Sequence, residues 1–117
     1  MTTVKIWHNP KCSKSRAALE LLESNKCEPQ IIKYLEDTPS VKEIKEVISM
    51  LKIDARALMR IKEDLYSQLN LNDASLSQDD LITAMHSNPT LIERPVVIKD
   101  GMAAIGRPIE NIMELIS

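Results

Sequence analysis

The sequence predicts an α/β protein whose core is a mixed four-stranded sheet, with a helical insertion in the middle of the chain. Three observations lead to this prediction. Short β-prone runs occur near both ends of the chain, amphipathic helical patterns fill about residues 38–92, and an Asp100-Gly101 pair marks a hairpin near the C-terminus. A length of 117 residues fits one domain, so we expect residues 1–117 to form a single domain that includes the insertion.

The first part of the chain predicts a strand, a helix and a second strand. Residues 4–7 form a β-prone run, and residues 13–25 are strong helix formers with apolar side chains at helical spacing. Pro29 ends the helical pattern, and residues 31–35 form a second β-prone run. A strand–helix–strand unit of this length predicts two parallel strands joined by a right-handed crossover.

Residues 38–92 carry helical patterns and no strong strand signal. Ser40 and Glu43 have the spacing of a capping box, and the apolar residues that follow recur on one helix face, namely Val41, Ile44, Val47, Ile48 and Leu51. We expect a second helix from its cap Asp54 to about residue 60. A third helix is expected from Ser77, with Asp80 at capping-box spacing, to about residue 87.

The C-terminal part predicts a β-hairpin followed by a helix. Residues 95–105 form two strands around the Asp100-Gly101 turn. Pro95 stands at the first position of its strand, where no ladder donor is lost, and Pro108 suits the first turn of the final helix. The complete order, β-α-β, helices, β-β-α, is a thioredoxin-like layout.

Composition and charge limit the function classes. The chain is 44% apolar and 27% charged with a formal net charge of −2, which gives no support to binding of nucleic acid or of an anionic membrane. The sequence has no signal-peptide pattern and no run of about 18 apolar residues, so we expect a cytoplasmic protein with reduced thiols. Its two cysteines, Cys12 and Cys27, are too few for a disulfide framework or a zinc site, and we expect no bound metal or cofactor.

Cys12 has the sequence context of a reactive thiolate. It follows a strand and a proline-containing turn and directly precedes a predicted helix, so unpaired backbone N–H groups and the positive end of the helix dipole point at it. Neighbouring positive charge lowers the pKa of a thiol further, and we expect it from His8, Lys11, Lys14 and Arg16. A buried structural cysteine is the alternative, but such a thiol does not usually lie among three cations.

Ser15 follows Cys12 at the position where dithiol enzymes carry a second cysteine. It is within reach to donate a hydrogen bond to the sulfur, but it cannot form a disulfide. Cys27 lies beyond the far end of the predicted helix, on the order of 20 Å away, whereas a disulfide needs Cα atoms within about 7 Å. We therefore predict that Cys12 works without an internal partner and is regenerated by an external thiol.

Four separated segments carry recognisable motifs, namely residues 8–16 (HNPKCSKSR), 58–60 (LMR), 91–97 (LIERPVV) and 105–108 (IGRP). Together they resemble the glutaredoxin-dependent arsenate reductases of the ArsC family, over essentially the whole chain. The resemblance implies a thioredoxin-like fold with a helical insertion. It also implies reduction of arsenate to arsenite, with glutathione as co-substrate and glutaredoxin as protein partner.

The resemblance also implies roles for single residues. Cys12 corresponds to the nucleophile that forms a covalent thiolate–arsenate adduct. Arg60, Arg94 and Arg107 match the arginines that bind the oxyanion, and guanidinium groups suit a tetrahedral anion because each offers paired charged donors. The alternative for each arginine is a solvated surface charge. It is weakest for Arg94 and Arg107, which each precede a proline at the edge of the sheet.

Supporting roles follow from the same motifs. His8 is expected to support the electrostatics of Cys12, and Ser15 and Arg16 are expected to be nearby donors. Pro95 resembles the cis-proline that lies opposite the catalytic cysteine in thioredoxin folds. Ser13-Lys14 replaces the Gly-Thr of the characterised reductases and is similar to a housekeeping subgroup of the family.

Two other functions stay open at this point. One is a redox-sensing transcriptional regulator resembling the Spx proteins, which bind RNA polymerase and commonly carry a Cys-x-x-Cys switch. Ser15 argues against such a switch here, although Cys12 alone can still sense oxidants by glutathionylation. The other is a general glutathione-dependent thiol–disulfide oxidoreductase, in which the arginines would be incidental.

Overall fold

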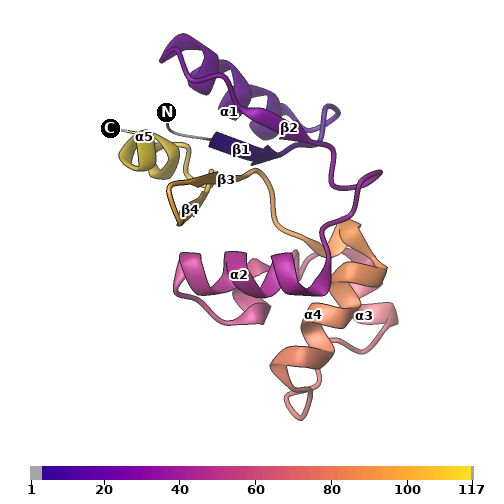
Figure 1. Ribbon diagram of the computed structural model, residues 1–117. Coiled ribbons are helices and arrows are strands. Elements are labelled where there is room, and N and C mark those ends of the chain that lie inside the picture. The colour runs from indigo at the N-terminus through magenta and orange to yellow at the C-terminus, as the bar shows by residue number, and fades with distance from the viewer. Residues whose placement is uncertain (1–3, 117) are drawn as a thin grey trace. The chain divides into compact units, whose positions relative to one another are not determined.

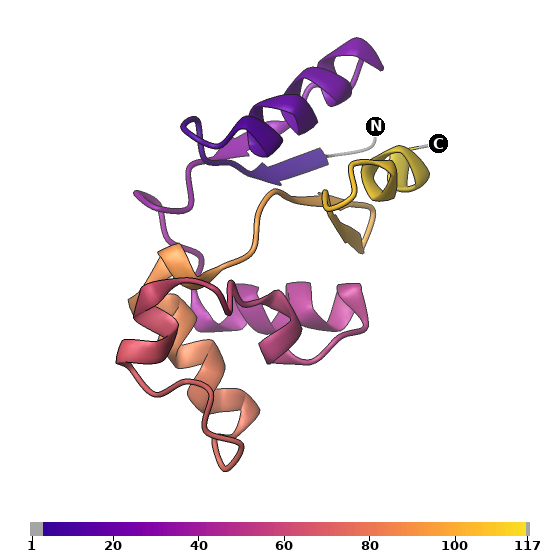
Figure 2. The ribbon, with the colours of Figure 1, turned by 180° about the vertical axis from the view of Figure 1, so that it is seen from behind.

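The computed structural model describes residues 4–116, which divide into two compact units. The first unit is formed by the described residues up to Asp37 and from Arg94 onward, and the second spans Thr38–Glu93. Figures 1 and 2 show the elements of both units from opposite sides. That the whole chain forms one domain stays a prediction. Within residues 4–116, no helix has the length and apolar character needed to cross a membrane.

The first unit contains a mixed four-stranded sheet in the order β2-β1-β3-β4 (Figure 1). β1 (Val4–Trp7) is parallel to β2 (Gln30–Ile32) and antiparallel to β3 (Val96–Lys99), which is antiparallel to β4 (Met102–Ile105). α1 (Ser13–Ser24) connects the two parallel strands. The predicted mixed sheet and its parallel pair are therefore confirmed.

The second strand is shorter than predicted. The sequence favours a strand over residues 31–35, but β2 ends at Ile32 and the chain turns at Lys33. The carbonyl oxygen of Lys33 accepts the N–H groups of Glu36 at 2.9 Å and Asp37 at 2.8 Å, so this carbonyl takes part in a turn instead of a strand ladder. The β-propensity of residues 33–35 is overridden by this local hydrogen bonding.

One face of the sheet is buried by two helices of the same unit. Val4 and Ile6 of β1 and Val97 of β3 form a cluster with Ala18 and Leu22 of α1 and with Ile112 and Leu115 of α5 (Glu110–Ile116). Alternation along β1 places Val4 and Ile6 on the same face. The apolar side chains of α1 therefore pack the helix against the sheet, and this packing fixes the position of its N-cap residue, Cys12.

The strand register brings three chain segments to one end of the sheet. Trp7, the last residue of β1, pairs with Ile32 of β2 and with Val96 of β3, and Val96 pairs with Ile105 of β4. The segments after Trp7, before Val96 and after Ile105 therefore leave the sheet side by side. The chemistry-bearing motifs of the first unit lie in these three segments.

The hairpin between β3 and β4 is confirmed. Asp100 has φ 51° and Gly101 has φ 74°, so both central residues adopt the left-handed conformation that a two-residue turn of this kind requires. Lys99 pairs with Met102 directly across it. The turn residues thus set the register that aligns Val96 with Ile105.

Gly106 follows β4 in a place without room for a side chain. Its N–H donates to the carbonyl oxygen of Pro95 at 2.9 Å, and a Cβ at this position would lie 2.6 Å from Cδ1 of Ile112 and 2.8 Å from Cγ of Pro95. We expect Gly106→Ala to lower the free energy of unfolding by about 1–3 kcal/mol, because the proline ring cannot rotate away. Chemical denaturation followed by circular dichroism measures this change.

Gly101→Asn is the matched control for that substitution. A Cβ at position 101 meets no atom within 4 Å, and asparagine tolerates the positive φ better than most residues. We expect a change of about 1 kcal/mol or less. Equal losses from the two substitutions would contradict the packing explanation for Gly106.

The second unit is helical, and its three predicted caps are confirmed. α2 (Val41–Leu51) begins after Ser40 with the reciprocal bonds of a capping box to Glu43, and α4 (Gln78–Ser87) begins after Ser77 in the same way with Asp80. Asp54 caps the next element as expected, accepting the N–H of Ala57 at 2.9 Å. Local hydrogen-bonding signals in the sequence therefore located these starts correctly.

The helix predicted from Asp54 to about residue 60 is a single 3₁₀ turn, η1 (Ala55–Leu58). It stops because Met59 pairs with Ile92 in an isolated antiparallel bridge, and Leu58 and Leu91 accept the N–H groups of Glu93 and Arg60, each at 2.7 Å. The sequence also missed α3 (Asp64–Gln68) and the 3₁₀ turn η2 (Pro89–Leu91).

Candidate active site

Cys12 is the N-cap residue of α1. Its φ of −97° and ψ of 121° are extended, its carbonyl oxygen accepts the N–H of Arg16 at 3.0 Å, and its own N–H donates to the carbonyl oxygen of Asn9 at 3.0 Å. The residue is 8% exposed. The predicted position at a helix N-terminus is therefore confirmed, and the sulfur lies where the first N–H groups of the helix are free of intrahelical partners.

The turn before Cys12 is held by polar groups of its own segment. Oδ1 of Asn9 accepts the N–H of Lys11 at 3.0 Å, and Nη1 of Arg16 donates to the carbonyl oxygen of Pro10 at 2.9 Å. Arg16 thus supports the site by fixing the turn. Its positive charge lowers the pKa of His8 and is not among the causes that lower the pKa of Cys12.

The environment of the sulfur lowers the pKa of Cys12. Burial of the thiol is the largest effect and raises its pKa, but it is outweighed by groups that favour the thiolate. These groups are the backbone N–H of Ser15, the Arg94 side chain, both as a hydrogen-bond donor and as a positive charge, and the backbone N–H of Lys14. Cys12 therefore carries more thiolate near neutral pH than an ordinary cysteine.

Ser15 and His8 support the site in a way that the sequence did not indicate. The Ser15 hydroxyl is fully buried and lies 2.6 Å from Nδ1 of His8, and it accepts the N–H of Asn9 at 3.0 Å. The expectation that this hydroxyl bonds to the sulfur is wrong, since the backbone N–H of Ser15 does so instead. The contacts of the Ser15 hydroxyl with His8 and Asn9 instead hold the start of α1 against the residues that follow β1.

The expectation that His8 adds positive charge is also wrong. Burial, followed by the positive charges of Lys33 and Arg16, lowers the pKa of His8, so the ring is neutral at neutral pH. Lys33 follows Ile32, which pairs with Trp7, and this register places it near His8. The sequence could not reveal this cation, because the contact crosses from β2 to β1.

Two of the three predicted arginines meet at Cys12. Nη2 of Arg107 lies 3.9 Å from Sγ of Cys12, and Nε of Arg107 donates to the carbonyl oxygen of Arg94 at 2.7 Å. The Arg94 side chain itself hydrogen-bonds to the sulfur. Two guanidinium groups from different loops therefore surround one thiolate, which is an arrangement suited to a small multivalent anion.

Both of these arginines precede a cis-proline. The cis peptide at Arg94-Pro95 agrees with the resemblance of Pro95 to the thioredoxin-fold proline. The peptide Arg107-Pro108 is also cis, which the sequence did not indicate. Pro108 lies just before α5, not within its first turn as expected, because α5 begins at Glu110.

Arg60, the third predicted arginine, belongs to the second unit. Its Nη1 forms an ion pair with Oε2 of Glu63 at 2.8 Å, and its backbone N–H donates to Leu91 across the start of the bridge between Met59 and Ile92. A role in anion binding stays a prediction for Arg60.

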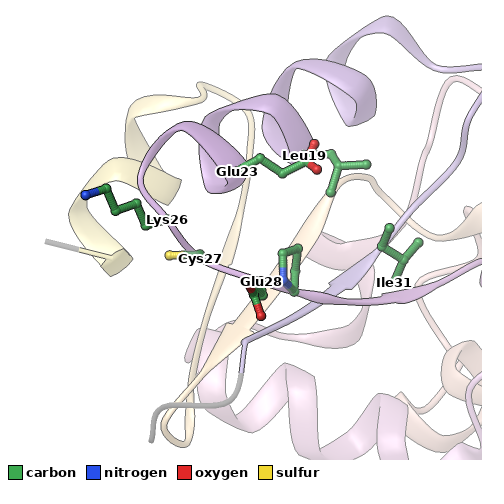
Figure 3. A pocket seen from close by; sticks show the side chains of 7 residues that line it. Leu19, Glu23, Lys26, Cys27, Glu28 and Ile31 are labelled. Atoms are coloured by element: carbon green, nitrogen blue, oxygen red, sulfur yellow. The ribbon is translucent and has the colours of Figure 1, made fainter.

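Cys27 lies near the other end of α1, and both cysteines are free thiols. It lines a groove of about 600 Å³ together with residues of α1 and of the segment before and within β2, including Leu19, Glu23, Lys26 and Ile31 (Figure 3). Its Sγ contacts the carbonyl oxygen of Asn25 at 3.9 Å. The helix separates the two sulfurs, as the sequence predicts.

In residues 4–116, no cluster of three or more His, Cys, Asp or Glu side chains could hold a metal ion.

We expect Cys12 to be alkylated faster than Cys27 at about pH 6.5, although Cys12 is the more buried of the two. The thiolate is the reactive form, so the rate at Cys12 stays high as the pH falls and drops only below its lowered pKa. Peptide mass spectrometry after a short exposure to iodoacetamide measures both rates in one sample. Equal rates would show that the donors around Cys12 do not activate it.

A cysteine of lowered pKa at a helix N-terminus, with two arginines at its sulfur, is the arrangement expected of thioredoxin-fold proteins that use a reactive cysteine. The model of the ArsC family matches residues 7–115, and the chain belongs to this family. A solved structure of an arsenate reductase from Vibrio cholerae is similar with a TM-score of 0.94 and 53% identity, and the match covers 97% of each chain. This likeness confirms the thioredoxin-like fold.

Two relatives agree with this assignment. The chain is 47% identical over 113 residues to an arsenate reductase of Neisseria meningitidis serogroup B, covering 96% of this chain and 97% of the relative. It is 50% identical over 114 residues to the uncharacterised protein YfgD of Escherichia coli K12, covering 97% of this chain and 96% of that protein. Both relatives are therefore matched over nearly their whole length.

Proposed function

We propose that this protein is a cytoplasmic arsenate reductase that takes electrons from glutathione and is regenerated by glutaredoxin. The observation that carries the proposal is the pair of arginines at the Cys12 sulfur, with Arg107 Nη2 3.9 Å away and the Arg94 side chain hydrogen-bonded to it. An activated thiolate supplies the nucleophile, and the guanidinium groups supply charged donors for an oxyanion. The names of the two arsenate reductases that are 47% and 53% identical support arsenate as the anion.

The first step forms a covalent adduct. The Cys12 thiolate attacks arsenic, an S–As bond forms, and one As–O bond breaks, with the departing oxygen leaving as water after it takes up protons. Arsenic remains pentavalent. Arg94 and Arg107 neutralise the charge of the bound oxyanion.

The second step reduces arsenic. A glutathione thiolate attacks the sulfur of Cys12, and the S–As bond breaks with its electron pair passing to arsenic. Pentavalent arsenic is thereby reduced to arsenite, and the two sulfur atoms are oxidised to a mixed disulfide. The third step returns Cys12 to the thiolate when a glutaredoxin thiolate attacks the glutathione sulfur.

Arsenate-dependent oxidation of NADPH tests the proposal, with glutathione, glutaredoxin and glutathione reductase supplied in excess. We expect turnover that requires arsenate, glutathione and this protein together. Turnover with a glutathione mixed disulfide but without arsenate would instead identify a general thiol–disulfide oxidoreductase. Absence of both activities, together with binding to RNA polymerase, would identify a regulator.

A further inference from the structure

A second groove of about 550 Å³ lies in the first unit, and Ser13, the residue after Cys12, is part of its lining. One wall comes from the start of α1 and the other from the segment between β4 and α5. Its lining includes Ser13, Lys14 and Ala17 on the first wall and Pro108, Ile109 and Glu110 on the second. The groove has a size typical of a small-molecule site.

Each wall of the groove includes a chain neighbour of a residue at the Cys12 sulfur. Ser13 directly follows Cys12, and Gly106, which also lines the groove, directly precedes Arg107. Nη2 of Arg107 lies 3.9 Å from Sγ of Cys12. A molecule whose sulfur attacks Cys12 can therefore extend the rest of its length along this groove.

The charges that line the groove differ from those at the anion site. Arg94 and Arg107 at the sulfur are both cationic, whereas the groove carries one exposed cation, Lys14, and one exposed carboxylate, Glu110. Ala17 and Ile109 add apolar side chains to the same lining. A groove with one group of each sign and an apolar lining fits a zwitterionic molecule with a short flexible body.

We propose that this groove binds the non-reacting part of a zwitterionic thiol co-substrate, with Lys14 at a carboxylate and Glu110 at an ammonium group. The inference rests on the proposed function, which requires an external thiol to attack Cys12. A tetrahedral oxyanion is much smaller than the groove and has no group for Glu110 to bind. A peptide-like thiol such as glutathione carries both charges and a reactive sulfur.

A thiol-exchange assay without arsenate tests the groove directly. Cys12 is converted to its mixed disulfide with 2-thiopyridine in a Cys27→Ser background, and incoming thiols release 2-thiopyridone as they form a new disulfide with Cys12. The release rate is compared for glutathione, its monoethyl ester, which lacks one carboxylate, and 2-mercaptoethanol, which carries no charge. We expect wild-type Cys12 to react with glutathione faster than with the ester.

Lys14→Gln is the decisive variant, and Lys11→Gln is its matched control. Both remove one exposed cation next to Cys12, but only Lys14 lines the groove. We expect Lys14→Gln to slow the reaction with glutathione about fivefold and that with 2-mercaptoethanol less than twofold, as for loss of one charge-assisted hydrogen bond. Glu110→Gln is expected to act in the same direction. Lys11→Gln is expected to change the rates of both thiols by the same factor.

Equal effects of Lys14→Gln and Lys11→Gln on the glutathione to 2-mercaptoethanol ratio would overturn the proposal. The circular dichroism spectrum of each variant confirms that it is folded before the rates are compared. Because the assay contains no arsenate, its result is independent of arsenate reduction. A protein that does not reduce arsenate can still show thiol selection through Lys14, and an arsenate reductase can fail to show it.

Discussion

Cys12→Ser is expected to lower arsenate-dependent NADPH oxidation at least about a thousandfold, because a serine hydroxyl at neutral pH does not replace a thiolate as nucleophile. Every step of the proposed cycle uses the Cys12 sulfur, first as nucleophile and then as half of the mixed disulfide. No other residue can take over this role by proximity, since Ser15 has no sulfur and Cys27 lies near the opposite end of α1. The coupled assay with purified protein measures the loss.

Cys27→Ser is the matched control for this variant. It makes the same chemical change in the same unit, and it is expected to keep activity within about twofold of the wild type, because the mechanism uses no internal resolving thiol. Retention of activity in Cys12→Ser would remove Cys12 from the reaction. Loss of activity in Cys27→Ser, with an unchanged circular dichroism spectrum, would show that the second thiol does take part.

Arg94→Ala and Arg107→Ala are expected to weaken oxyanion binding, and Arg94→Ala is also expected to raise the pKa of Cys12. Arg94 is half-buried, so removing it is expected to cost about 1.5–3 kcal/mol of anion binding. Arg107 is more exposed, so its loss is expected to cost about 1 kcal/mol. The half-protecting concentration of arsenate or sulfate against alkylation of Cys12 measures both changes.

The pH dependence of alkylation measures the effect on the pKa of Cys12 separately from the effect on anion binding. The Arg94 side chain lowers the pKa of Cys12 as a donor and as a charge, so Arg94→Ala moves the onset of rapid alkylation to higher pH. Lys5→Gln removes an exposed cation from β1 and serves as the control of equal charge change. The same half-protecting anion concentration in Arg94→Ala, Arg107→Ala and Lys5→Gln would exclude both arginines from the site.

Local signals in the sequence predicted many of the helix starts and turns of both units. The two capping boxes, the Asp100-Gly101 turn and the helix that begins at Cys12 were all predicted correctly. Each depends on side chains within a few residues of the backbone groups that they bond to, so it can be read without knowing the fold. The errors in the second strand and in the helix after Asp54 occurred where turn bonds or a distant bridge replaced the local preference.

The sequence by itself determined that Cys12 lies at a helix N-terminus, which makes it the candidate nucleophile, and that Ser15 cannot form a disulfide with it. Only the tertiary structure decided which groups meet the sulfur. The pairing of Trp7 with Val96 and of Val96 with Ile105 brings Arg94 and Arg107 to Cys12.

The same sheet register decided how the supporting residues act. Burial of Ser15 against His8 turns its hydroxyl away from the sulfur, and Lys33, placed by the parallel pairing of β1 and β2, helps to keep His8 neutral. These contacts depend on residues far apart in the chain, and their geometry is set by strand pairing and burial instead of by neighbouring residues. Sequence patterns therefore indicated the Cys12 sulfur as the candidate reactive atom, whereas the folded sheet determined its electrostatic environment.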